Sequence, residues 1–308
     1  MSAPELVTGI IMLAAIAAAP LVPGLIQQHK ARLQGRVGTT ALQPYRDLRR
    51  LWRKAVVQPA GTSVVYVLVP AMCAAALLAA LLITPVGPSA PPYGVGHDAL
   101  VLVGVLALAR CIVALSAWDT GSGFGLMSAA RDLTFAVLGE ALIALVLLLA
   151  ALPVGSTDLR AMWLGAAGSH IWTAPAHWCG LVGMLLIVMM ETGRQPIDNP
   201  DTHLELTMVH EGPLLEYAGR DLAYLQWSVA ARHWIVLVLL AGLFLPHPAG
   251  ALIGPAVVVV WVVILTVVLA LIETFRAKLR LLVVPQLTAV VSLIGFVGVV
   301  SWVIGLGR

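Results

Sequence analysis

The chain has 308 residues, of which 60% are hydrophobic and 11% are charged, and its mean hydropathy is +0.96. A soluble globular domain carries about 25% charged residues, so this composition excludes a soluble enzyme, a nucleic-acid-binding protein and a disordered tail. The net charge of +3 is small, and its distribution along the chain is more informative than its size.

Long apolar stretches predict the fold class. A bilayer core about 30 Å thick needs roughly 20 apolar residues in each helical span. We therefore expect an all-α, polytopic integral membrane protein, a single membrane domain over residues 1–308 with about eight transmembrane helices. The predicted spans are residues 4–26, 62–84, 99–118, 131–152, 175–193, 230–246, 251–272 and 283–305. We do not expect the first to be a cleaved signal peptide, because no Lys or Arg precedes it.

The segment between the first two spans is strongly basic. Apolar side chains recur in it every three or four residues, which predicts a short amphipathic helix at 42–54 lying on the membrane surface. The apolar stripe is Leu42, Tyr45, Leu48 and Trp52, and the basic face is Arg46, Arg49, Arg50, Arg53 and Lys54. These basic side chains either bind lipid phosphates only or also contact a partner protein.

The basic residues also predict the topology, because Lys and Arg gather in cytoplasmic loops. With the loops at about 27–61 and 194–229 placed in the cytoplasm, 15 of the 18 basic residues fall inside and 2 fall outside. Arg110 is left out because it lies within the third span. Both termini are then expected to be periplasmic, and the protein is expected in the cytoplasmic membrane.

One acid and one base lie deep in predicted spans, where a charge costs at least about 2.5–3.5 kcal/mol. Glu140 is about nine residues into the fourth span, and Arg110 is in the middle of the third. Glu140 has two interpretations. It is either a proton-relay carboxylate, with burial and a neighbouring arginine opposing each other in setting its affinity for a proton, or a structural ion pair with Arg110.

Other charges lie at predicted span ends. Asp119 and the pair Arg131–Asp132 flank a glycine-rich turn, and Asp132 is explained either by a coupling role or by a helix N-terminus whose dipole favours an acid. Glu191 and Glu273 end the fifth and seventh spans, where they either mark the water boundary or take part in function.

Metal sites are poorly supported. Cys73, Cys111 and Cys179 are not clustered as a zinc or iron–sulfur site requires, and we expect all three to be buried and inert. His203 and His210 are seven residues apart and share one helix face, so they are either metal ligands or, as we favour, ordinary polar residues of a cytoplasmic helix. No metal site is predicted in this chain.

Three stretches carry a family resemblance. They are METGRQPIDNPDTHLELTMVHEGPLLEYAGRDLAYLQW after the fifth span, LQPYRDLRRLWRK at 42–54 and DTGSGFGLMSAARDLTFAVLGE at 119–140. They resemble the membrane subunit of energy-converting, formate-hydrogenlyase-type [NiFe] hydrogenases, which is homologous to subunit 1 of respiratory complex I. With eight spans, the resemblance covers nearly the whole chain.

The resemblance implies a non-catalytic subunit of an oxidoreductase complex. It would dock a soluble hydrogenase arm and link electron transfer to ion translocation. Its partners would be the hydrogenase large and small subunits and antiporter-like membrane subunits, with the [NiFe] centre and iron–sulfur clusters on those partners. The implied proton-coupling residues are Glu140, Glu191, Asp198, Asp201, Glu205, Glu211 and Glu216, joined by Arg110, Asp119, Arg131 and Asp132 from the charge pattern, and the arm-docking residues are Arg46, Arg49, Arg50 and Arg53.

Two departures from the family pattern matter. The complex I loop typically has a Phe-Asp-Leu-Pro-Glu core, where this chain has residues 196–201, PIDNPD. This favours the hydrogenase branch over the alternative, a quinone-reductase subunit. In the hydrogenase branch Arg131 is commonly followed by Glu, and Asp132 shortens that reach. A third alternative is a free-standing secondary transporter.

Overall fold

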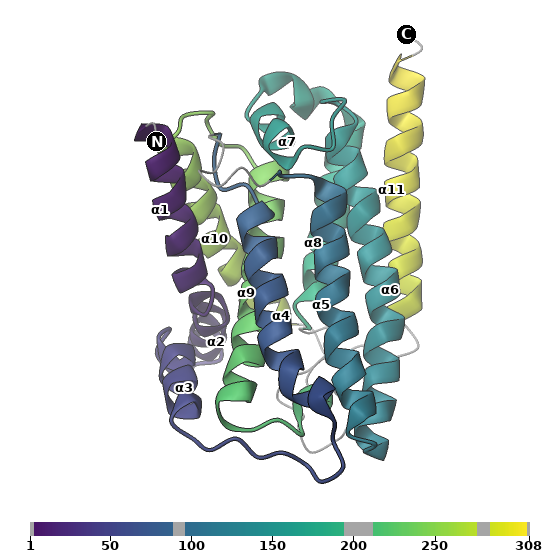
Figure 1. The fold of residues 1–308 in the computed structure, drawn as a ribbon. Coiled ribbons are helices and arrows are strands. Elements are labelled where there is room, and N and C mark those ends of the chain that lie inside the picture. Colours follow the sequence, from purple (N-terminus) through teal and green to yellow (C-terminus); the bar gives the residue numbers. More distant parts are fainter. Residues whose placement is uncertain (1–2, 89–95, 194–211, 276–283, 307–308) are drawn as a thin grey trace.

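The computed structural model describes residues 3–88, 96–193, 212–275 and 284–306, and helices run side by side through most of these ranges (Figure 1). The prediction of an all-α polytopic membrane protein is confirmed. The helices are α1 Ala3–Ala18, α2 Leu21–Leu33, α3 Gln43–Trp52, α4 Val64–Ile83, α5 Ala99–Asp119, α6 Gly123–Ala151, α7 Leu159–Ala166, α8 Pro175–Glu191, α9 Gly219–Phe244, α10 Ile253–Phe275 and α11 Val284–Leu306, with 3₁₀ turns η1 Ser169–Thr173 and η2 Gly212–Leu214.

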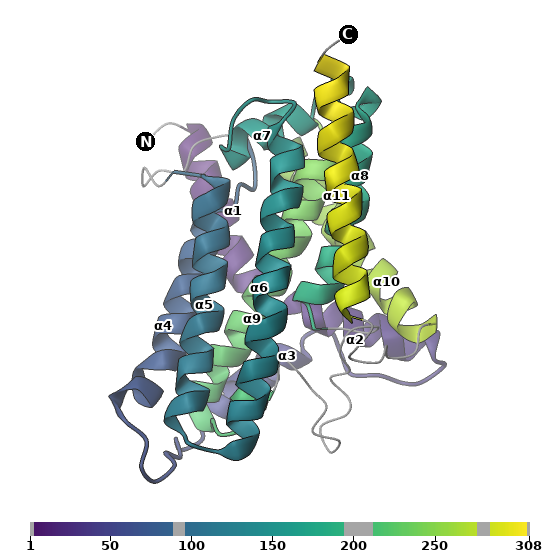
Figure 2. The same cartoon turned by 90° about the vertical axis from the view of Figure 1, so that its right-hand side faces the viewer.

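Helix α9 lies at the centre of the helix bundle. In its most apolar window 89% of the residues are buried, against 22% in α11, which stands at the outside beside α6 and α8 (Figure 2). Helix α9 contacts α2, α3, α4, α7, α8 and α10. The run of apolar residues from 234 to 244 in its second half fits such a buried position.

Among the described residues, six or seven candidate spans stand against the eight that were predicted, and not all bounds agree. Six are long and apolar enough to cross a membrane, the bent pair α1–α2 supplies a seventh, and α8 is a shorter apolar helix of 17 residues. Helix α6 begins at Gly123 and α9 at Gly219, eight and eleven residues before the predicted starts. The predicted starts were late because charged residues were assigned to the water boundary.

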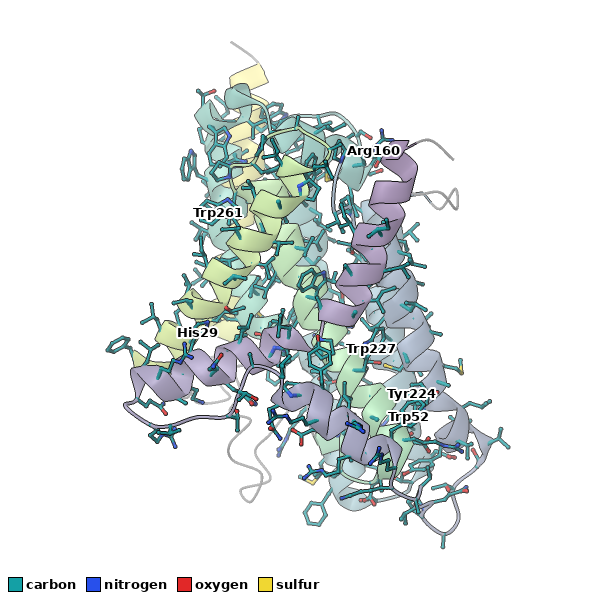
Figure 3. The ribbon with its side chains drawn as sticks, turned by 90° about the vertical axis from the view of Figure 1, so that its left-hand side faces the viewer. His29, Trp52, Arg160, Tyr224, Trp227 and Trp261 are labelled. Atoms are coloured by element: carbon teal, nitrogen blue, oxygen red, sulfur yellow. The ribbon has the colours of Figure 1, made fainter. Side chains whose placement is uncertain are left out.

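The first predicted span is broken. Helices α1 and α2 meet at Pro20 with a bend of 48°, because proline offers no N–H to continue the helical hydrogen bonds. Helix α2 then continues to Leu33 and, with α3, runs across one end of the bundle (Figure 3). Gly24 allows the close approach of the next segment, since a Cβ there would lie 2.1 Å from the Ala41 carbonyl oxygen.

Helix α3 occupies the predicted amphipathic segment and packs on α9. The rings of Trp52 and Tyr224 meet edge to face, 5.2 Å apart (Figure 3). Leu51 is the buried residue of α3, while Leu42 and Trp52 are 54% and 56% exposed. The contact of Trp52 with Tyr224 agrees with the expectation that the apolar stripe lies on a neighbouring span or on the bilayer.

The opposite end of the bundle holds α7 and the outer ends of α1 and α11 (Figure 1). Helix α7 lies in the segment between the predicted fourth and fifth spans, and Trp163 on it is fully buried. Asp98 and Asp158 cap α5 and α7 by accepting backbone N–H groups, and a β-bridge joins the two residues.

The cysteines differ from one another in exposure. Cys73 is buried and Cys179 is half-buried, but Cys111 is exposed on α5. The expectation that all three are buried is therefore wrong for Cys111, because its side of α5 faces out of the bundle.

Candidate functional site

Four charged side chains meet inside the bundle, one from each of four helices. Arg110 comes from α5, Glu140 from α6, Glu191 from α8 and Arg232 from α9, and each is between 4% and 8% exposed. Charges in such a place persist when opposite charges compensate them. These four residues are called the charge cluster below.

Each arginine of the charge cluster contacts both acids. Arg232 Nη1 lies 2.8 Å from Glu191 Oε2 and 3.2 Å from Glu140 Oε1. Arg110 Nη2 lies 2.5 Å from Glu191 Oε2, and Arg110 Nε lies 3.8 Å from Glu140 Oε1. Arg232 also donates to the Leu106 carbonyl. Two positive and two negative groups therefore form one balanced network rather than two separate pairs.

The two acids are held differently. Glu191 Oε2 accepts hydrogen bonds from both arginines. Glu140 Oε1 accepts one, at 3.2 Å from Arg232, and its buried Oε2 accepts none from the described residues. Glu140 is thus the more loosely bound carboxylate, and it has an oxygen open to a proton.

A cavity of about 90 Å³ adjoins the charge cluster. One buried water molecule needs a cavity volume of about 10–15 Å³, so this cavity has room for several water molecules. Three members of the cluster line it, together with residues of α4, α5, α6, α8, α9 and η2: Cys73, Leu77, Ala109, Arg110, Val113, Asp132, Glu191, Thr192, Leu214, Leu225, Ser228, Val229, Arg232 and His233. The lining is largely apolar, but its charged and polar side chains supply the hydrogen-bond partners that a buried water requires.

Comparison with known proteins bears on this arrangement. A sequence profile described as NADH dehydrogenase matches residues 6–304, nearly the whole chain. The chain belongs to the NADH dehydrogenase family. This NADH dehydrogenase family protein is 31% identical to formate hydrogenlyase subunit 4 of Escherichia coli (strain K12), over 88% of this chain and 90% of that protein.

Two further relatives are similar to this family member. Hydrogenase-4 component C of Escherichia coli (strain K12) is 31% identical, over 93% of this chain and 92% of that protein. An NADH-quinone oxidoreductase subunit of Verminephrobacter eiseniae is 28% identical, over 66% of this chain and 59% of that protein. The resemblance found in the sequence is therefore confirmed, with the hydrogenase-type relatives aligned over more of the chain.

The fold has a solved counterpart. A chain in the structure of the membrane-bound sulfane sulfur reductase, an archaeal respiratory membrane complex, superposes with a TM-score of 0.82 over 98% of this chain and 100% of that chain, at 17% identity. At that identity the likeness establishes the fold alone.

The structure brings three predicted site residues together. The expected pair of Arg110 and Glu140 is present, at 3.8 Å. Glu191 joins them, so it does not mark a water boundary. Glu273 is likewise buried, and its carboxylate lies 3.5 Å from Lys30 Nζ of α2, away from the charge cluster.

Arg232 is the site residue that sequence reasoning missed. It was counted with the cytoplasmic basic residues because a span was expected only from residue 230 onward. The helix begins at Gly219, which puts Arg232 thirteen residues inside α9. A signal was available, since the residues on both sides of it, from 229 to 245, are otherwise almost all apolar.

The residues around the glycine-rich turn have separate places. Asp119 accepts the backbone N–H groups of Ser63 and Tyr66 at 2.8 and 3.2 Å, which caps α4. Asp132 is buried and lines the cavity, while Arg131 is half-buried. The helix-terminus explanation for Asp132 is wrong, because Ser122 is the N-cap of α6.

The predicted loop at 194–229, called the acidic loop below because it carries most of the implied proton-coupling acids, is described only from Gly212 onward. The predicted residues Asp198, Asp201, Glu205 and Glu211, with His203 and His210, lie outside the described residues. Glu216 is half-buried, apart from the charge cluster, and its carbonyl accepts the Tyr66 hydroxyl at 2.7 Å.

Two stacked tyrosines fix the end of that loop against α4. The rings of Tyr66 and Tyr217 lie 4.3 Å apart and nearly parallel, and the Tyr217 hydroxyl donates to the Tyr66 carbonyl at 3.1 Å. Burial raises the pKa of Tyr217, so its phenol stays neutral and remains a donor. The described end of the loop is thereby held beside the cavity.

Proposed function

We propose that this chain is the membrane subunit of a formate-hydrogenlyase-type complex, in which it joins a peripheral hydrogenase arm to proton movement through the membrane. The alignment with two hydrogenase-type subunits over most of their length supports the type of complex. The observation that carries the proton-coupling role is the charge cluster, with Glu140 as its loosely held acid.

Proton exchange on Glu140 follows from the sharing of the arginines. Arg110 and Arg232 each reach both acids, so a small shift of a guanidinium toward Glu191 weakens its hold on Glu140. The freed carboxylate takes up a proton, and the return of the guanidinium expels it. Redox chemistry in a partner subunit would move that subunit and displace one of these arginine side chains slightly. This displacement would therefore change the protonation of Glu140.

The energy scale fits one proton step. Moving one charge against about 150 mV costs roughly 3.5 kcal/mol, at about 2.3 kcal/mol per 100 mV. Loss or gain of one buried ion-pair contact is of similar size, about 3–5 kcal/mol. The free energy of rearranging one arginine of the charge cluster is thus large enough to move one proton against this membrane potential.

Redox cofactors are assigned to the partner subunits. Among the residues that the structure describes, no three His, Cys, Asp or Glu side chains gather as a metal site requires. The [NiFe] centre and iron–sulfur clusters are expected on the hydrogenase large and small subunits, and the antiporter-like subunits would receive the proton step laterally.

The surface of α3 and the acidic loop are proposed to face the hydrogenase arm. Arg46, Arg49, Arg50 and Arg53 are exposed on and just after α3, which lies at the end of the bundle that the positive-inside rule places in the cytoplasm. With that orientation, both termini are periplasmic.

The test is proton translocation by the purified complex in liposomes. Glu140→Gln keeps the size of the side chain and removes the exchangeable proton, so we expect an assembled complex whose turnover is slow or no longer coupled to proton movement. Asp221→Asn is the matched control, because Asp221 pairs with the exposed Arg220 near the start of α9, away from the charge cluster. Wild-type turnover together with wild-type proton translocation in Glu140→Gln would refute the proposal.

The same preparation tests the alternative functions. Metal analysis that finds nickel in the complex favours the hydrogenase assignment. Reduction of an added quinone without nickel favours the quinone-reductase assignment, for which the 28% identity to an NADH-quinone oxidoreductase subunit is the supporting observation. Proton transport by the isolated chain would favour a free-standing transporter.

A further inference from the structure

The end of α2 is a tight, basic turn at the edge of the bundle. The Gly35 N–H donates to the Arg32 carbonyl at 3.0 Å, and the Arg36 N–H donates to the Ala31 carbonyl at 2.9 Å. These two bonds form a Schellman motif, which requires the positive φ of 67° that Gly35 adopts. Because backbone N–H groups satisfy these carbonyls, the side chains of Arg32 and Arg36 are not needed to cap the helix.

The segment after the turn packs directly on α2. A Cβ at Gly38 would lie 2.2 Å from the Ala31 Cβ, and a Cβ at Gly24 would lie 2.1 Å from the Ala41 carbonyl oxygen. Close contacts near both ends of residues 36–41 therefore hold this segment against the helix. The position of Arg36 relative to α2 is set by this packing as well as by the Schellman motif.

The two arginines of the turn carry uncompensated charge. Arg32 and Arg36 are exposed, and in the part of the chain that the structure describes neither forms an ion pair. Arg36 donates to the side-chain oxygen of Gln34, which orients its guanidinium. Lys30 differs, because its Nζ lies 3.5 Å from the buried carboxylate of Glu273 on α10. Arg32 and Arg36 are thus available to an anion from outside the chain.

The contact between Lys30 and Glu273 also sets the level of this turn in the membrane. Helix α10 is long and apolar enough to cross a bilayer, and Glu273 lies in its last described turn. Figure 3 shows α2 passing beneath this end of α10. The end of α2 therefore lies near the boundary between hydrocarbon and water.

Apolar side chains are exposed at the same boundary. Leu33 of α2 is 44% exposed and Phe275 of α10 is 79% exposed. Exposed apolar side chains beside basic ones suit the headgroup region of a membrane, where the apolar groups reach the acyl chains and the charges reach phosphate. A soluble anion would neutralise the arginines but would leave Leu33 and Phe275 in water.

We propose that this turn binds an anionic phospholipid, with Arg32 and Arg36 on the headgroup phosphate and with Leu33 and Phe275 against the upper acyl chains. The lipid bridges α2 and α10 at the membrane surface. The site is separate from the basic face of α3, and it does not depend on the type of complex to which the chain belongs.

The experiment compares phosphatidylglycerol with phosphatidylcholine at this turn, using the complete complex in lipid nanodiscs. A fluorophore is attached through Val37→Cys, at an exposed position next to Arg36, in a chain whose exposed native thiol is removed by Cys111→Ser. Lipids brominated near the headgroup quench it. We expect half-maximal quenching at an about 30-fold lower mole fraction of phosphatidylglycerol, from about 1 kcal/mol for each of two basic residues.

Arginine variants test which side chains cause this preference. Arg32→Gln and Arg36→Gln are each expected to reduce it to about fivefold, and the double variant to abolish it. The matched control is Arg220→Gln, which removes an exposed positive charge near the start of α9 that Asp221 already pairs, and which should keep the full preference. Equal quenching by the two lipids in wild type, or an undiminished preference in the double variant, overturns the proposal.

Three further outcomes separate the lipid from other ligands. Relief of quenching by added glycerol phosphate would show that the turn binds a soluble anion instead. A fluorophore that neither lipid quenches would show that the turn lies in water or under a partner subunit, and either result overturns the proposal. If the double variant does not assemble, wild type is measured in rising salt, where screening should weaken the preference, and a salt-independent preference overturns the role of the arginines.

Discussion

The carboxylate of Glu191 occupies the space that a side chain at Gly139 would need. A Cβ at Gly139 would lie 2.7 Å from Glu191 Oε1, which is closer than non-bonded carbon and oxygen atoms approach. The residue that precedes Glu140 on α6 is therefore small so that an acid of α8 can reach both arginines. The geometry of the charge cluster depends on this glycine.

Gly139→Ala is expected to displace Glu191 and weaken its contacts with Arg110 and Arg232. We predict at least about tenfold lower proton-coupled turnover with the complex still assembled, on the scale of one weakened charge-assisted hydrogen bond of about 1.5–3 kcal/mol. The matched control is Gly104→Ala, an exposed position on α5 where a Cβ would meet nothing within 4 Å. Equal activity of the two variants would contradict the role given to Gly139.

Arg232 and Glu191 are expected to show strong coupling in a double-mutant cycle. Arg232→Gln leaves two buried carboxylates with one arginine, so we expect the stability of the detergent-solubilised protein to fall by about 3–5 kcal/mol. Removing a negative charge as well, in Arg232→Gln with Glu191→Gln, is expected to restore much of the stability but not proton-coupled turnover. Thermal unfolding and proton uptake are measured on the same samples, and additive losses of stability would argue against a shared network.

The sequence predicted the fold class and most of the spans because apolar stretches of about 20 residues are a strong signal. It was less informative about where they begin. A charge inside a span has the same appearance in the sequence as a charge at its end, and Arg131, Asp132 and Arg232 were all assigned to the boundary. All three lie within α6 or α9.

The membership of the charge cluster depends on contacts between distant parts of the chain. Glu191 is 41 residues from Arg232 and 81 from Arg110 along the sequence. No local pattern reports that α5, α6, α8 and α9 present these side chains at one level. Pro20 indicates the break between α1 and α2. The break was not predicted because the first span was assigned from the high overall hydrophobicity of the residues around Pro20.

The outer end of the bundle is expected to lose stability on acidification. His247 joins α7 to the α9–α10 connection, with Nδ1 2.9 Å from the Leu245 carbonyl and Nε2 3.2 Å from the Trp163 carbonyl. Burial lowers the pKa of His247 below its usual value of about 6.5. The unfolded chain therefore binds a proton at a higher pH than the folded protein does, and stability falls as the pH drops below about 6.5.

Thermal unfolding between pH 5 and 8 checks this expectation. The wild-type unfolding midpoint should decrease below about pH 6.5, and His247→Gln, which keeps a neutral polar side chain, should reduce that dependence. The control is the same substitution at His29, which lies on α2 at the other end of the molecule (Figure 3). An unchanged pH dependence in His247→Gln would show that other groups cause the acid sensitivity.

The basic face of α3 offers two distinguishable outcomes. Arg49, Arg50 and Arg53 are exposed, while Leu51 is buried and Trp52 contacts Tyr224, so charge reversal of the three arginines leaves the packing of α3 on α9 intact. Each basic residue near an anionic surface is worth about 1 kcal/mol. If the arginines only bind lipid phosphates, the triple Glu variant keeps the hydrogenase arm unless the topology inverts.

If the arginines also contact the arm, the arm is lost while the topology holds. We expect this second outcome, because α3 packs on α9 and its arginines are exposed. Co-purification of the arm is measured together with the accessibility of single cysteines introduced at residues 37 and 57, two exposed positions on either side of α3. The control is Leu42→Gln, which changes an exposed apolar residue at the start of α3 without altering charge. Retention of the arm by a correctly oriented triple variant would assign the arginines to the lipid surface alone, and loss of the arm in the control as well would point to a general defect of α3 rather than to charge.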